Sequence, residues 1–388
     1  MQLLKNSGIG FTDTKKHYQI LDGLRGVASI IVVLFHILET FTDGDHAKQI
    51  INHGYLAVDF FFVLSGFVIG YAYDDRWGKM SLKDFFKRRL VRLHPMIIVG
   101  MLIGAATFYL QDSYFFPAIA QTPVWKMLLV MVIGFTLIPI GNSLDIRGWT
   151  EMHPLDGPAW SLFFEYIGNI LYALFIRKLS NTVLAILVFI AGAALIHLAV
   201  TSPHGDVIGG WSIDPAQLRI GFTRLLYPFL AGLLLSRIVK PGQIKNAFTW
   251  ASLILFVFLA IPRVGTHETV WMNGLYDSLT IILIFPLIVY IGASGDLKTK
   301  MASKLSRFLG DISYPLYIIH YPFIYMYMTW IAKNQEFINT SPYAKTTLVL
   351  ISAALLVVTV ALAHGLFKFY DVPVRKWLSK KFMSKAAK

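Results

Sequence analysis

The sequence predicts an all-α integral membrane protein in which about ten transmembrane helices form a single bundle. The first observation is composition: 56% of the 388 residues are hydrophobic, 15% are charged, and the mean hydropathy is +0.59. Soluble domains are less apolar and carry about 25% charged residues. The second is a series of ten apolar runs, each close to the roughly 20 residues that cross a hydrocarbon core. The third is the uneven distribution of Lys and Arg between those runs.

The ten apolar runs are separated by polar segments. They cover residues 19–41, 54–73, 95–111, 159–176, 182–201, 219–236, 247–262, 274–292, 311–332 and 344–367. No internal repeat or separate soluble domain is visible. We therefore expect one transmembrane domain at 19–368, preceded by a cytoplasmic tail at 1–18 and followed by a basic cytoplasmic tail at 369–388.

An eleventh apolar run at 125–140 is short, and the cationic residues decide how it is interpreted. If this run does not cross, 26 of the 35 Lys and Arg residues lie on one side. Because these residues concentrate in cytoplasmic loops, both termini are then cytoplasmic. We expect residues 125–140 to be re-entrant or interfacial, and the protein to lie in the inner or plasma membrane. The net charge of +13 indicates attraction to anionic lipid headgroups and not to nucleic acid.

Two further patterns concern packing. Residues 80–95 place Leu and Phe among Lys and Arg, which predicts an amphipathic helix at the cytoplasmic interface. Glycines stand four residues apart at Gly66 and Gly70, and again at Gly100 and Gly104. Small residues at this spacing are typical of closely packed transmembrane helices.

Arg25 and His36 are eleven residues apart in the first apolar run. At about 100° and 1.5 Å per residue, this spacing returns to within about 20° of the same helix face after about 16.5 Å. A guanidinium and an imidazole are costly to place in hydrocarbon. We therefore expect Arg25, near the inner face, and His36, in the outer third, to face the same protein-lined passage.

The other ionisable residues of the spans gather toward the predicted outer side, with one exception near mid-membrane. Those near the outer ends are Glu39, Asp59, Glu165 and Arg224, and the one near mid-membrane is His320. Two structural interpretations remain open. In one, Asp59 or Glu165 pairs with Arg224 inside the bundle. In the other, His320 is a packed core histidine.

These residue types suit a transfer reaction across the bundle. Arg25, Arg89 and Arg92 are expected to bind the anionic head of a phosphorylated donor, since guanidinium groups pair bidentately with phosphate. A neutral His36 is expected to accept the proton of an acceptor hydroxyl, with Glu39 or Asp59 orienting the ring. The alternative is a transporter or exporter, in which the buried charges mark an ion or substrate pathway.

Five stretches between residues 18 and 323 resemble one known family, acyltransferase family 3. They are YQILDGLRGVASIIVVLFH, GYLAVDFFFVLSGFVIG, FFKRRLVRLHP, GPAWSLFFEY and LGDISYPLYIIHYPF, in that order. The resemblance implies a ten-helix enzyme that moves an acyl group, usually acetyl, from cytoplasmic acetyl-CoA. The acceptor is a hydroxyl of a glycan or glycolipid at the outer side, and no metal is involved.

The resemblance also implies roles for particular residues. The family's Arg-x10-His pattern falls on Arg25 and His36, and its Arg-x-x-Arg pattern falls on Arg89 and Arg92. His36 is then the general base or a transient acyl carrier. The remaining expected site residues are Ser65 and His320 for the donor, and Trp160, Ser161, Glu165 and Arg224 for the acceptor.

Overall fold

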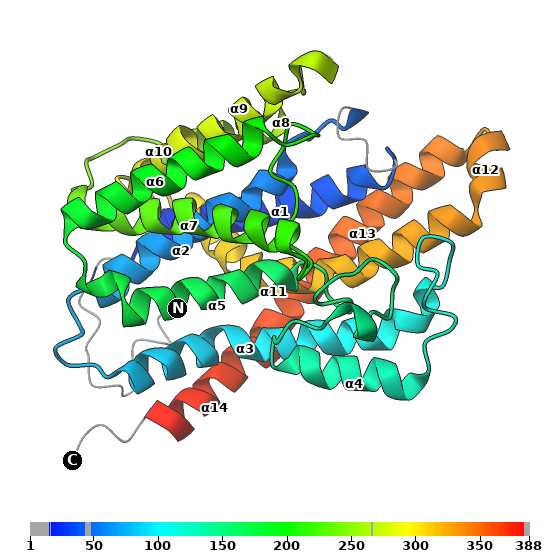
Figure 1. The fold of residues 1–388 in the computed structure, drawn as a ribbon, viewed down its shortest axis with the longest axis horizontal. Helices are drawn as coiled ribbons and strands as arrows, with labels where there is room; N and C mark the ends of the chain where they lie inside the picture. The colour runs from blue at the N-terminus through cyan, green and yellow to red at the C-terminus, as the bar shows by residue number, and fades with distance from the viewer. Residues whose placement is uncertain (1–14, 16, 43–47, 265–266, 384–388) are drawn as a thin grey trace.

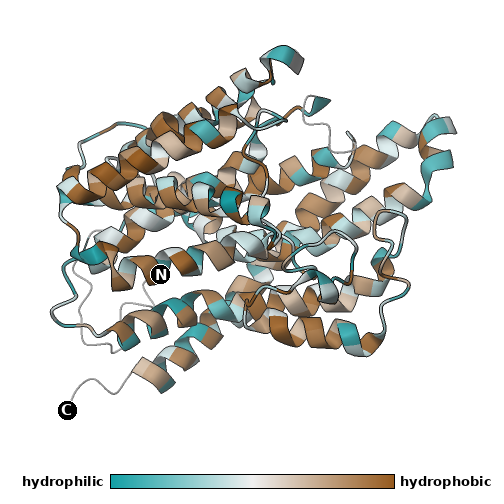
Figure 2. Cartoon of the chain, viewed as in Figure 1, coloured by the Kyte–Doolittle hydropathy of each residue, from teal (hydrophilic) through white to brown (hydrophobic). Residues whose placement is uncertain are grey.

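The computed structural model describes residues 15, 17–42, 48–264 and 267–383, and within these ranges the fold is helical without β-strands (Figure 1). Most of the predicted N-terminal tail and residues 384–388 of the predicted C-terminal tail therefore lie outside the described residues. The helices run roughly along one common direction. Hydrophobic residues cover their lengths, whereas hydrophilic residues gather in loops and at helix ends (Figure 2).

Fourteen α-helices are described, and two of their junctions are single π-helical turns. The α-helices are α1 (Gln19–Glu39), α2 (Ala57–Tyr73), α3 (Leu82–Thr107), α4 (Val124–Phe135), α5 (Ala159–Leu174), α6 (Asn181–Val200), α7 (Pro215–Ile238), α8 (Ala247–Ala260), α9 (Trp271–Leu279), α10 (Phe285–Ala293), α11 (Lys300–Lys333), α12 (Gln335–Thr340), α13 (Ala344–Leu366) and α14 (Val372–Met383). The π-helical turns are η8 (Thr280–Ile284), between α9 and α10, and η9 (Phe367–Asp371), between α13 and α14.

Each of the ten predicted apolar runs coincides with a helical segment. Within the described ranges, eight of these segments are long and apolar enough to cross a membrane. The other two, α8 and α11, differ for physical reasons. α8 has only 14 residues, and α11 contains Pro315, His320 and Pro322 among its apolar residues. The all-helical, multi-pass membrane class is confirmed, and the count of ten spans stays a prediction.

α1 carries Arg25 and His36 and lies against α11 along much of its length (Figure 1). A Cβ atom added at Gly26 would overlap the backbone carbonyl of Leu309, so the two helices approach to backbone contact. The Ser29 hydroxyl donates to the carbonyl oxygen of Ser313 at 2.9 Å. This contact fixes the face that α1 presents to the rest of the bundle.

α2 and α7 form the second close helix pair. A Cβ added at Gly66 would overlap the carbonyl oxygen of Phe229, and one added at Gly232 would overlap that of Val63. On α3, added Cβ atoms would likewise overlap neighbours, Ile318 at Gly100 and the carbonyl of Leu155 at Gly104. The glycines picked out by their spacing thus serve packing.

Gly66→Ala is expected to destabilise the protein, because the new methyl group meets a backbone oxygen that cannot rotate away. Overpacking of this kind costs about 1–3 kcal/mol. The measurement is the thermal unfolding midpoint of the purified protein in detergent. Gly78→Ala is the matched control, since no atom lies within 4 Å of a Cβ built there. Equal midpoints for the two variants would contradict the packing role of Gly66.

α3 is one continuous helix that includes the basic segment 80–95. It begins with a capping box in which the Ser81 hydroxyl accepts from the Asp84 backbone N–H, and it passes through Pro95 without a break. The expected amphipathic helix is therefore the first part of α3, joined directly to the predicted span at 95–111.

α4 occupies the predicted re-entrant segment 125–140 and runs beside the second half of α3 (Figure 1). A Cβ added at Gly134, near its end, would meet Met101 of α3, and Gly104 of α3 touches Leu155, which precedes α5. α3 therefore ends and α5 begins at the same end of the bundle. This arrangement is compatible with a segment that does not cross, which stays a prediction.

Candidate active site

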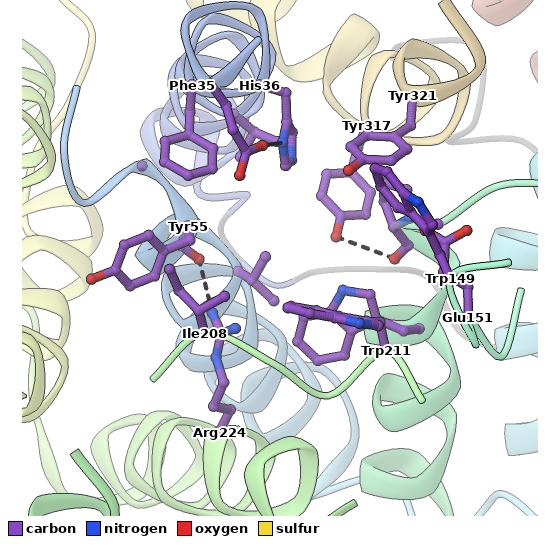
Figure 3. Close-up of a pocket in the computed structure, with 17 residues that line it drawn as sticks. Phe35, His36, Tyr55, Trp149, Glu151, Ile208, Trp211, Arg224, Tyr317 and Tyr321 are labelled. Carbon is purple, nitrogen blue, oxygen red and sulfur yellow. Dashed lines mark hydrogen bonds and ion pairs between the residues drawn. The ribbon is translucent and has the colours of Figure 1, made fainter. Parts of the chain in front are cut away.

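A cavity of about 340 Å³ opens near the end of α1 (Figure 3). Its walls come from five helices, a short helical turn and two loops. The residues that matter below are His36 and Glu39 of α1, Tyr55 of the 3₁₀ turn Gly54–Leu56, Trp160 of α5, Arg224 of α7, Tyr317 and Tyr321 of α11, and Trp149, Glu151 and Trp211 of the loops before α5 and α7.

His36 lies on the cavity wall and is held by its surroundings. Its Nδ1 atom is 3.0 Å from Oε2 of Glu39, one turn further along α1. The ring of Tyr321 meets it edge-on at 4.8 Å between centroids, and the ring of His320 stacks beside it at 5.5 Å. A carboxylate that accepts a hydrogen bond from Nδ1 favours the tautomer in which the ring proton is on Nδ1. The lone pair of a neutral His36 is then on Nε2.

Asp59 and Arg224 form a buried ion pair next to the cavity. Nη2 of Arg224 lies 2.6 Å from Oδ2 of Asp59, and Nε lies 3.2 Å from Oδ1. Nη2 also donates to the carbonyl oxygen of Tyr55 at 2.8 Å, and the guanidinium lies over Trp160. Asp59 is fully buried. The expectation that Asp59 orients His36 needs correction, because both of its oxygens bind Arg224 and the carboxylate on His36 is Glu39.

The cavity floor contains residues from α5 and α11. Ser161 and Tyr317 share a hydrogen bond of 2.7 Å between their hydroxyl oxygens, and the Tyr317 ring packs edge-on against Phe61. Trp160, Arg224 and Tyr317 line the cavity, and Ser161 is hydrogen-bonded to Tyr317 without lining it. Three of the four predicted acceptor-side residues are thus near the cavity.

Glu165, the fourth, lies one helical turn further along α5 and faces a different group. Its Oε1 accepts from Nη2 of Arg89 at 2.7 Å and from the Ser65 hydroxyl at 3.0 Å. Glu165 does not line the cavity, because its carboxylate joins the arginine group, and its role on the acceptor side stays a prediction. Distance from a helix end gives depth, but it does not give the partner helix, which here is α3.

Three arginines predicted to bind a donor gather near the beginning of α1. Arg92 interacts electrostatically with Arg25 and Arg89. Arg89 is 4% exposed, whereas Arg92 is exposed. None of the three lines the cavity. The cavity that His36 lines therefore does not extend to Arg25, and the expected passage between the two residues stays a prediction.

His320 lies behind His36 and does not line the cavity. Its Nδ1 atom is 2.8 Å from the carbonyl oxygen of Tyr317, so Nδ1 carries the proton and donates. Nε2 is buried without a hydrogen-bond partner. His320, which was predicted on the donor side, is thus a buried residue of α11 whose ring stacks on that of His36.

The loop before α5 contributes residues that the sequence reasoning missed. Trp149 lines the cavity, and its indole N–H donates to the carbonyl oxygen of Phe115 at 2.7 Å. Glu151 accepts from the Tyr325 hydroxyl at 2.6 Å. Burial raises the pKa of Glu151 to about 7 against the opposing effect of Arg147. The only available signal was the presence of Trp and charged residues in the polar segment 142–158.

Trp211 reaches the cavity from the loop before α7. The two loops are tied together where the Met152 backbone N–H donates to the carbonyl oxygen of Trp211 at 2.7 Å. Among the described residues, no group of three or more His, Cys, Asp or Glu side chains is arranged to hold a metal ion. The polar groups that line the cavity are an imidazole, carboxylates, a guanidinium and phenol hydroxyls, among aromatic side chains.

Comparisons with known proteins give several relatives. Protein 2 in the picA locus of Rhizobium radiobacter is 33% identical over 169 residues, which are 41% of this chain and 82% of that protein. A candidate O-acetyltransferase of Staphylococcus aureus strain COL is 25% identical over 398 residues, covering 96% of this chain and 60% of that protein. The O-acetyltransferase OatA of Staphylococcus aureus strain NCTC 8325 is 24% identical, covering 92% of this chain and 57% of OatA.

The chain spans about 60% of the length of these staphylococcal relatives. No solved structure matches it. A family model described as an acyltransferase domain matches residues 18–366, from just before α1 to the end of α13. The chain therefore belongs to this family of membrane acyltransferase domains.

Proposed function

We propose that this protein is an O-acyltransferase of the inner or plasma membrane that moves an acetyl group from cytoplasmic acetyl-CoA to a glycan or glycolipid hydroxyl at the outer side. The observation that carries the proposal is the His36–Glu39 pair on the wall of a cavity, on the same helix as Arg25. The family supports the reaction class. The bias of Lys and Arg supports the orientation, with the arginine group facing the cytoplasm.

The proposed chemical step uses groups that line the cavity. Nε2 of His36 takes the proton of the acceptor hydroxyl while that oxygen attacks the thioester carbonyl carbon. The new C–O bond forms, the C–S bond breaks, and the departing sulfur receives the proton from the imidazolium. Glu39 holds the ring and stabilises its positive charge. In the variant with an acyl carrier, Nε2 attacks first and the hydroxyl attacks second.

The donor is proposed to enter from the arginine side. Arg25, Arg89 and Arg92 would bind its phosphates, and the thioester arm would pass Ser65 and His320 toward His36. We propose that the Ser161–Tyr317 hydrogen bond, which joins α5 to the cavity-lining Tyr317, lies on this route. We expect that bond to open when the thioester reaches the cavity. Membrane lipid is proposed to surround the helix bundle. No nucleic-acid partner is proposed.

The acceptor is proposed to occupy the cavity itself. Trp149, Trp160 and Trp211 line it with large flat apolar surfaces, and the polar groups of His36, Glu39 and Arg224 line it as well. Trp149 and Trp211 lie on the side of the cavity opposite His36 (Figure 3). Ligand pockets commonly combine apolar walls with a few polar groups that fix orientation. The C–H faces of a sugar ring fit such walls, and its hydroxyls can reach His36. The cavity walls therefore favour a glycan over an aliphatic alcohol.

Trp149→Ala is expected to raise the KM for the glycan about tenfold, because the change removes an aromatic face worth about 1.4 kcal/mol. Trp149→Phe should retain most of the affinity. Trp250→Ala is the matched control, since that indole is 54% exposed on α8 and does not line the cavity. The measurement is the initial rate against acceptor concentration. An unchanged KM for Trp149→Ala would remove this residue from the acceptor site.

Purified protein in liposomes separates the proposed enzyme from the transporter. Acetyl-CoA is supplied on the arginine side, and glycan on the other side is analysed by mass spectrometry. The enzyme releases CoA and adds an acetyl mass to the glycan. A transporter would instead carry intact solute across the membrane without CoA release. Flux without acyl transfer would overturn the proposed function.

A further inference from the structure

α14 packs against the beginning of α3, which places the C-terminal helix beside the arginine group. The π-helical turn η9 joins α13 to α14, so that Ala344–Met383 form one continuous helical segment. The Tyr370 hydroxyl donates to the carbonyl oxygen of Pro95, and Nζ of Lys87 donates to that of Phe382. These bonds attach both η9 and the end of α14 to α3. Arg375, in the first turn of α14, is thereby carried toward Arg92.

Arg375 adds a fourth guanidinium to the group. Arg25, Arg89 and Arg375 each interact unfavourably with Arg92. Like charges repel one another, so nearby anions are needed to offset them. Three carboxylates offset this positive charge in part. Asp22 attracts Arg25 and Arg92, and Glu165 forms an ion pair with Arg89. Oδ2 of Asp371 is 2.5 Å from Nη2 of Arg375, and Asp371 also attracts Arg92. Four cations against three anions leave a surplus of positive charge.

The hydrogen-bonding capacity of the group is also incomplete. The Nε atoms of Arg89 and Arg375 are buried and have no hydrogen-bond partner among the described residues. Arg89 is 4% exposed, so its N–H groups have little access to bulk water as a hydrogen-bond acceptor. A buried N–H group without an acceptor is costly. A ligand with several anionic oxygens would supply the missing acceptors and offset the surplus charge at once.

We infer that Arg375 is a fourth donor-binding residue, which together with Arg89 and Arg92 binds a phosphate of the acyl-CoA, and that Asp371 is the carboxylate with which this phosphate competes. The inference rests on the proposed function, because it concerns the donor of the same reaction. It makes α14 part of the donor site. Asp371 then reduces the affinity for the donor by occupying Arg375 and attracting Arg92.

The test is binding of CoA to the full chain in nanodiscs of neutral lipid. Arg375→Gln is expected to weaken CoA binding about tenfold, whereas Arg375→Lys, which keeps the charge, should lose less. Lys376→Gln is the matched control on the same helix, because Lys376 is exposed. It should change the affinity less than twofold. Asp371→Asn, which keeps the size but removes the charge, should strengthen CoA binding.

The outcomes separate this inference from the proposed function. If the wild-type protein does not bind CoA, the donor assigned by the proposed function fails. If the wild type binds CoA and Arg375→Gln binds it equally well, only the inference about Arg375 is overturned. A lipid headgroup could supply the same phosphate chemistry. Retention of phosphatidylglycerol that depends on Arg375, with unchanged CoA affinity in neutral discs, would assign the residue to lipid and overturn the inference.

Discussion

His36→Ala is expected to lower the rate of acyl transfer by about 10³-fold while leaving the protein folded and able to bind CoA. Proton transfer by a positioned base contributes about 10²–10⁴-fold to a rate. His36 is the imidazole on the cavity wall with a carboxylate on one ring nitrogen. It is half-buried, so its removal should cost little stability. The measurement is kcat for glycan acetylation in liposomes.

Glu39→Gln provides the companion measurement for His36. The amide can still contact Nδ1, but it cannot stabilise the imidazolium by charge, so we expect a smaller loss of about tenfold to a hundredfold. The unfolding midpoint and CoA affinity of both variants serve as controls for folding and donor binding. A folded His36→Ala protein that acetylates at the wild-type rate would exclude His36 as base and as acyl carrier.

The sequence was most informative where hydrophobicity alone determines structure. Runs of apolar residues located all ten helical segments, because the hydrocarbon core sets their length. It was less informative at α3, where the basic part of the segment and the apolar part form one helix through Pro95. It could not reveal that α14 packs against α3, because this contact joins segments far apart in the chain.

The candidate site divides in the same way. The spacing of Arg25 and His36 follows from helix geometry, so their shared helix could be used before any tertiary contact was known. The partner of a buried charge could not be predicted, since Glu165 and Asp59 had several cations within reach in the sequence. Trp149 and Trp211 lie in loops whose approach depends on a backbone hydrogen bond between segments far apart in the chain. The periodic pattern of hydrophobic residues does not predict where loop residues such as these lie.

Asp59→Asn is expected to be the most destabilising single change near the cavity. It leaves the guanidinium of Arg224, which is only 1% exposed, without its carboxylate partner. Removing one member of a buried ion pair costs about 3–5 kcal/mol, because the remaining charge is neither paired nor hydrated. The thermal unfolding midpoint in detergent should fall strongly, and Arg224→Gln should lower it for the reciprocal reason.

The comparison with an exposed ion pair isolates this cause. Lys15 and Asp75 also approach to 2.7 Å, but the Asp75 side chain is 61% exposed. Exposed pairs contribute about 0–1 kcal/mol, so Asp75→Asn should leave the midpoint almost unchanged. The double variant Asp59→Leu with Arg224→Met should recover part of the loss, since it removes both charges and keeps apolar volume. If Asp59→Asn and Asp75→Asn shift the midpoint equally, burial is not what makes the Asp59–Arg224 pair important.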